Sequence, residues 1–104
     1  MAISLEQAHE FYNDKAIFID ARDLEYFNEG HIPGAWDSDI FSELIVRLDS
    51  LQGKDGSIIT YCDGDECGSS EELAYELQEA GFANIFVFVG GWSEWKQAGL
   101  SIEK

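Results

Sequence analysis

The residues best suited to chemistry lie where a cysteine separates an apolar run from a helical pattern. The run Ser57–Tyr61 reads as a buried strand, Cys62 follows it directly, and the polar loop 63–68 leads to a predicted helix. We expect that helix to begin at Ser69, because Ser69 and Glu72 have the spacing of a capping box. Backbone N–H groups of such a loop and the helix dipole favour an anion, and a cysteine beside them tends toward thiolate. The stretch is therefore predicted to be a site for thiolate chemistry.

The rest of the chain supplies elements that would position this cysteine. We expect five strands, at Ile3, Ala16–Ala21, Ala35–Asp37, Ser57–Tyr61 and Asn84–Val89. Helical patterns follow each strand, at residues 4–12, 23–28, 41–51, 69–80 and 92–97. Apolar strands alternating with helices predict an α/β domain with a mainly parallel sheet, in which ligands sit at the carboxyl ends of strands. Cys62 is at such an end.

Length and charge restrict the class of protein. The 104 residues predict one domain, 1–104, and no apolar run approaches the roughly 20 residues that span a membrane. The N-terminus has no signal-peptide pattern, so we expect a cytoplasmic protein. With 6 basic and 21 acidic residues the net charge is −15, which argues against nucleic acid and anionic membranes as partners. The charge favours solubility, or attraction to a basic partner protein, since no Lys or Arg occurs between Lys54 and Lys96.

Four motifs, in order along the chain, resemble the landmarks of single-domain rhodanese-like proteins. They are Ile19–Arg22 (IDAR), Glu29–Ala35 (EGHIPGA), Tyr61-Cys62, and Val89–Trp92 (VGGW) with the Ala98–Leu100 (AGL) that follows. The resemblance implies the rhodanese fold, a five-stranded, mainly parallel sheet flanked by helices on both faces. It implies a sulfurtransferase in which Cys62 carries a persulfide and passes its outer sulfur to a thiol or cyanide, with no metal and no cofactor. A small sulfur donor and a thiol acceptor would then be its partners.

The resemblance also assigns roles to other residues of the chain. The persulfide would be held by the loop residues Asp63, Gly64, Asp65, Glu66, Gly68 and Ser69. Asp20, Arg22 and His31 would be structural framework, joined by a salt bridge or hydrogen bonds.

One departure from the family pattern concerns the loop after Cys62. Family loops usually reach an arginine four or five residues after the cysteine, but this loop contains none and is about two residues longer than the family pattern. Phosphatases and arsenate reductases of this fold use that arginine to clamp an oxyanion, so those activities are not expected. The loop carries Asp63, Asp65 and Glu66 instead. Each carboxylate about 7 Å from a thiolate costs roughly 0.6 kcal/mol in water and about 2 at an effective dielectric of 20, so thiosulfate should be a weak donor.

The second cysteine, Cys67, leaves three functions open. The chain is a sulfurtransferase using Cys62 alone, a thiol–disulfide or persulfide relay using Cys62 and Cys67 as a pair, or a catalytically silent acidic protein-binding module. In the relay, Cys67 either forms a disulfide with Cys62 or attacks a Cys62 persulfide and releases hydrosulfide. Otherwise Cys67 is a bystander in a longer loop. The cysteines, His9 and His31 have no spacing typical of a zinc site.

Overall fold

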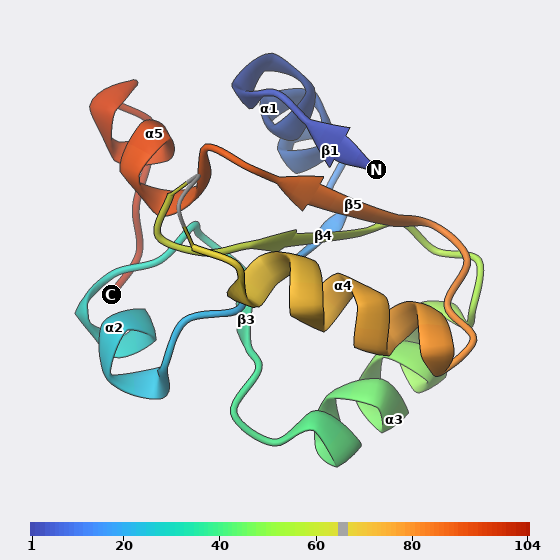
Figure 1. Cartoon of the computed structure of the whole chain (residues 1–104). Coiled ribbons are helices and arrows are strands. Elements are labelled where there is room, and N and C mark those ends of the chain that lie inside the picture. The colour runs from blue at the N-terminus through green and yellow to red at the C-terminus, as the bar shows by residue number, and fades with distance from the viewer. Residues whose placement is uncertain (65–66) are drawn as a thin grey trace.

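A computed structural model of the chain describes residues 1–64 and 67–104 (Figure 1). The elements, in order, are β1 (Ala2–Ile3), α1 (Leu5–Asn13), β2 (Ile17–Asp20), α2 (Leu24–Glu29), β3 (Trp36–Asp37), α3 (Phe41–Gln52), β4 (Ile58–Tyr61), α4 (Ser69–Glu79), β5 (Ile85–Phe88) and α5 (Gly91–Gln97). Strands and helices alternate as the apolar patterns predict. Within the described residues, none of the helices has the length and apolar character needed to cross a membrane.

The five strands form one sheet in the order β1-β5-β4-β2-β3, and every pairing is parallel. The central strand is β4, which ends at Tyr61. Its neighbours end level with it, because Tyr61 is in register with Asp20 of β2 and with Phe88 of β5. The residues that follow these three strands therefore emerge together at one edge of the sheet, and Cys62 is the middle one.

Helices cover both faces of the sheet, which confirms the predicted α/β fold (Figure 1). On one face, α1 and α5 pack through Ala8, Trp92 and Trp95 onto the sheet residues Phe18, Ile59, Tyr61 and Phe88. On the other, α3 and α4 pack through Leu44, Leu48, Leu73, Ala74 and Leu77 onto Ile19, Ile58, Ile85 and Val87. Alternate residues of β4 enter opposite clusters, so this strand is buried on both faces, as its continuous apolar sequence predicts.

The helix ends match the sequence expectation in part. Ser4 and Gln7 form a capping box at the start of α1. The capping box predicted at Ser69 was wrong: α4 does begin at Ser69, but Gly68 is its N-cap and no side chain caps it. Ser69 therefore lies inside the first turn, where its hydroxyl cannot take the N-cap position. At the other end Ala80 is the C-cap, and Gly81 follows it with a φ of 101°.

Candidate active site

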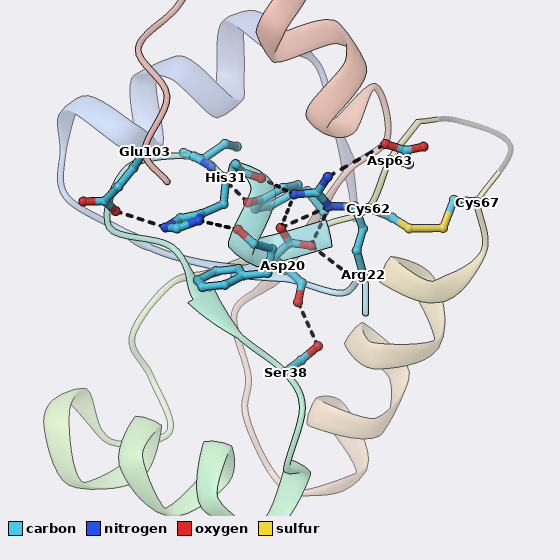
Figure 2. Close-up of polar contacts among 12 residues, drawn as sticks. Asp20, Arg22, His31, Ser38, Cys62, Asp63, Cys67 and Glu103 are labelled. Carbon is cyan, nitrogen blue, oxygen red and sulfur yellow. Dashed lines mark hydrogen bonds and ion pairs between the residues drawn. A yellow bond between two sulfur atoms is a disulfide. The ribbon is translucent and has the colours of Figure 1, made fainter. Parts of the chain in front are cut away.

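Cys62 lies directly after the last residue of β4 and is only 3% exposed (Figure 2). Its sulfur is joined in a disulfide to Cys67, which is partly exposed at the end of the loop before α4. The two Cα atoms are 6.2 Å apart, a separation that disulfides commonly span. The structure thus describes the oxidised form of the cysteine pair.

The start of α5 holds the backbone of Cys62 in place. The N–H of Trp92 donates to the carbonyl of Cys62, and the N–H of Ser93 donates to the carbonyl of Asp63, each at 2.8 Å. Gly91 makes this close approach possible: its φ is 59°, and a Cβ there would collide with the Cys62 carbonyl. The paired glycines before Trp92 therefore serve the cysteine loop as well as the turn after β5.

The first turn of α4 lies on the other side of the loop. Buried Thr60 of β4 donates its hydroxyl hydrogen to the carbonyl of Ser70 at 2.9 Å, which holds this turn against the strand that carries Cys62. Gly68, the N-cap of α4, has no side chain that could accept from the N–H groups of the first turn. A helix start beside the cysteine loop suits a bound or developing anion.

Asp20 and Arg22 form a buried ion pair beside this loop (Figure 2). Asp20 is the last residue of β2 and is 0% exposed, and the side chain of Arg22 is 6% exposed. Arg22 Nη2 donates to Asp20 Oδ2 at 2.7 Å and to the carbonyl of Gly30 at 2.6 Å, and Arg22 Nε donates to Asp20 Oδ1 at 3.0 Å. Burial alone would lower the pKa of Arg22, but the hydrogen bonds and charge of Asp20 outweigh it, so that pKa is raised. Arg22 is therefore a permanent, rigidly held cation.

Arg22, the cysteine loop and the start of α4 line one pocket of about 270 Å³. Its lining consists of residues that follow β2 and β4, with the loop and helix residues next to them: Ala21, Arg22, Asp23, Tyr26, Cys62, Asp63, Cys67 and Ser69. A larger pocket, about 510 Å³, lies beside the amino end of β2 and is lined by no cysteine. The smaller pocket is the candidate active site because it combines the cysteine pair with a fixed cation.

The pocket gathers some of the residues expected from the sequence and leaves others out. Cys62, Cys67, Asp63, Ser69 and Arg22 share it. Gly64 lines a neighbouring pocket with Ser93, Gly68 caps α4, and Asp20 lies behind Arg22. Asp65 and Glu66, also expected in the loop, lie outside the described residues.

Two features of the pocket were missed in the sequence. One is Tyr26 of α2, which is 51% exposed and lines the pocket. The other is Arg22, expected only as framework, which also lines the pocket. The parallel pairing of the strands could have predicted the place of Arg22. Asp20 and Tyr61 are the last residues of two paired strands, so the residues that follow these strands lie close together.

His31 connects the C-terminal segment to the turn beside the pocket. Its Nδ1 donates to the carbonyl of Phe27 at 2.8 Å, and its ring stacks on the Phe27 ring with centroids 3.8 Å apart. Its backbone exchanges two hydrogen bonds with Glu103, at 2.8 and 2.9 Å. The neighbouring Ile32 N–H donates to the Tyr61 hydroxyl, so this segment also contacts the end of β4. Burial and then the nearby charge of Asp20 raise the pKa of Tyr61, which keeps this hydroxyl neutral.

Replacing Glu103 with Gln should weaken this connection in a pH-dependent manner. The Gly34 N–H and then His31 Nε2 hold the carboxylate of Glu103 and lower its pKa below the usual 4.5. A lowered pKa means that the stabilisation is present above about pH 4.5 and is lost as the pH falls through the folded value. We expect Glu103→Gln to lower the thermal midpoint near neutral pH, with the difference from wild type disappearing in acid. Exposed Glu76 of α4 provides the control, since Glu76→Gln removes one negative charge without such contacts; equal shifts for both variants would contradict the prediction.

Comparison with known proteins agrees with this architecture. The family model "Rhodanese-like domain" matches residues 4–98. Thiosulfate sulfurtransferase GlpE of Haemophilus influenzae (strain PittEE) is 32% identical over 101 residues, covering 97% of this chain and 92% of that protein. The crystal structure of the BH2092 protein from Bacillus halodurans superposes with a TM-score of 0.82 at 26% identity, covering 98% of this chain and 75% of that one. The Alr3790 protein from Anabaena sp. gives a TM-score of 0.78 at 28% identity, covering 97% and 79%.

These similarities define the class of protein. The chain belongs to the rhodanese-like domain family. Its fold, with a parallel five-stranded sheet and helices on both faces, is the rhodanese-like fold.

Proposed function

We propose that the chain is a sulfurtransferase that carries a sulfane sulfur as a persulfide on Cys62. The observation that carries the proposal is the position of Cys62, at the carboxyl end of the central strand and in one pocket with Arg22 and the start of α4. The similarity to a thiosulfate sulfurtransferase supports the same reaction class.

The reaction begins from the reduced cysteine pair. The Cys62 thiolate attacks the sulfane sulfur of a donor, and the donor's sulfur–sulfur bond breaks with its electron pair leaving on the remainder, which is sulfite when the donor is thiosulfate. A thiolate or cyanide acceptor then attacks the outer sulfur of the Cys62 persulfide and regenerates the Cys62 thiolate. The N–H groups at the start of α4, and the charge of Arg22 in the same pocket, favour the anionic forms of Cys62.

The charges around the pocket indicate which donors suit it. Asp63 is 75% exposed, and its Oδ1 lies 4.0 Å from Arg22 Nη1. Arg22 therefore offsets part of the negative charge of the loop, although Asp20 already uses its other nitrogens. A donor with one charge or none should be used better than the thiosulfate dianion. The overall charge of −15 also suits a basic protein as donor or acceptor.

Intact-protein mass spectrometry tests this function directly. The Cys67→Ser variant, reduced and freed of reductant, is incubated with thiosulfate and separately with a small persulfide donor. We expect a gain of about 32 Da that dithiothreitol removes, larger with the persulfide donor, and no gain after Cys62→Ser. The Cys67→Ser background is used because it leaves Cys62 as the single thiol of the chain.

A lack of mass gain in Cys67→Ser with both donors would overturn the proposal. The silent protein-binding module would then be the better account of the domain. A gain that persists after Cys62→Ser in the otherwise wild-type chain would instead move the persulfide to Cys67.

A further inference from the structure

We infer that Cys67 is a resolving thiol, which makes the domain a reductase of sulfane sulfur that releases hydrosulfide and consumes a dithiol. The inference rests on the proposed persulfide at Cys62 and adds a second activity at the same pocket. Its basis is the disulfide, in which Cys67 reaches the sulfur atom of Cys62 itself.

The bond geometry selects which sulfur Cys67 attacks. A thiol that only accepted the transferred atom would approach the outer sulfur of the persulfide. In this structure Cys67 Sγ is bonded to Cys62 Sγ, which is the inner sulfur of that persulfide. Attack along this path therefore expels the outer sulfur instead of accepting it.

The resolving step balances without an external oxidant. The Cys67 thiolate attacks Sγ of the protonated persulfide, Cys62–S–SH, and a Cys62–Cys67 bond forms. The bond between Cys62 Sγ and the outer sulfur breaks, and its electron pair leaves with that sulfur as HS⁻. The outer sulfur is reduced, and the two cysteines together are oxidised to the disulfide.

Burial determines how the disulfide would be reopened. Cys62 is 3% exposed, whereas Cys67 is partly exposed and lines the pocket. An external dithiol therefore reaches Cys67 first and forms a mixed disulfide with it, with Cys62 leaving as a thiolate. The second thiol of the reductant then releases Cys67. The leaving thiolate forms in the pocket that the start of α4 and Arg22 also line, where an anion is favoured.

A single-turnover experiment without oxygen tests the inference. Reduced wild-type protein and Cys67→Ser, each freed of reductant, receive one equivalent of a small persulfide donor, and hydrosulfide and protein mass are followed together. In wild type we expect one hydrosulfide for each protein and a mass about 2 Da below the reduced chain. In Cys67→Ser we expect the sulfur to stay on Cys62 as a gain of about 32 Da, with hydrosulfide released at least ~10-fold more slowly. Addition of dithiothreitol with excess donor should then sustain release in wild type.

Two results would overturn the inference. One is wild-type protein that keeps the gain of about 32 Da without releasing hydrosulfide. The other is Cys67→Ser releasing hydrosulfide at the wild-type rate, which would show that Cys67 takes no part. Failure of the proposed function is recognised separately, because Cys67→Ser would then gain no mass at all.

Discussion

Replacing Asp20 with Ala should lower the free energy of unfolding by about 3–5 kcal/mol, because it leaves the buried charge of Arg22 without its partner. Asp20 is 0% exposed and accepts from both Nε and Nη2 of Arg22, and its Oδ1 also accepts from the Arg22 backbone N–H at 2.9 Å. Among the described residues, the Gly30 carbonyl, the more distant Asp63 and the face of the Trp92 ring would remain near the guanidinium. Urea denaturation of the reduced protein measures the change.

Asp23 provides a matched control three residues further along the chain. It is exposed, and its side chain makes no capping hydrogen bond at α2. Asp23→Ala should therefore change the free energy of unfolding by no more than about 0.5 kcal/mol. Adding Arg22→Met to Asp20→Ala should recover part of the loss, since it removes the unpaired charge. Equal losses for Asp20→Ala and Asp23→Ala would contradict the assignment.

The fold could be predicted because its signals are local and repeated. The largely apolar strands β2, β4 and β5 are mostly buried, and short polar turns with Gly30, Gly53 or Gly81 end the helices before the next strand. Strands that are joined through helices in this way usually pair in parallel. Helix caps were less predictable, because a serine with Gln or Glu three residues later fits both an N-cap and a first helical turn. Ser4 is the N-cap of α1, whereas Ser69 is the first residue of α4.

Within the candidate site, only residues that directly follow a strand could be placed from the sequence. Cys62 could be placed at the sheet edge from sequence because it follows the central strand. The contact between α5 and the Cys62 carbonyl depends on tertiary packing across 29 residues, which no spacing rule expresses. His31 and Glu103 pair through an isolated antiparallel bridge. The periodicity of the sequence near the C-terminus does not predict such a bridge. Spacing alone also left open whether Cys67 bonds to Cys62, since loop conformation decides whether two sulfurs five residues apart can meet.

Replacing Gly91 with Ala should lower the free energy of unfolding by roughly 2–4 kcal/mol and reduce sulfur loading of Cys62. Two causes add together. The φ of 59° costs an L-residue about 1 kcal/mol or more, and the new Cβ would collide with the backbone carbonyl of Cys62, which no side-chain rotation can relieve. Relief requires α5 or the Cys62 loop to move, and either movement breaks the hydrogen bond from Trp92 N–H to the Cys62 carbonyl.

Gly99 separates the two causes. Its φ is 74°, but a Cβ there would have open space, with no atom within 4 Å. Gly99→Ala should therefore cost only the conformational part, about 1 kcal/mol, and leave the gain of about 32 Da at Cys62 unchanged. The excess loss in Gly91→Ala, measured by urea denaturation, then reports the collision with the Cys62 carbonyl. If Gly91→Ala lost stability but loaded sulfur as fully as Gly99→Ala, the position of that carbonyl would matter to the fold and not to the chemistry of Cys62.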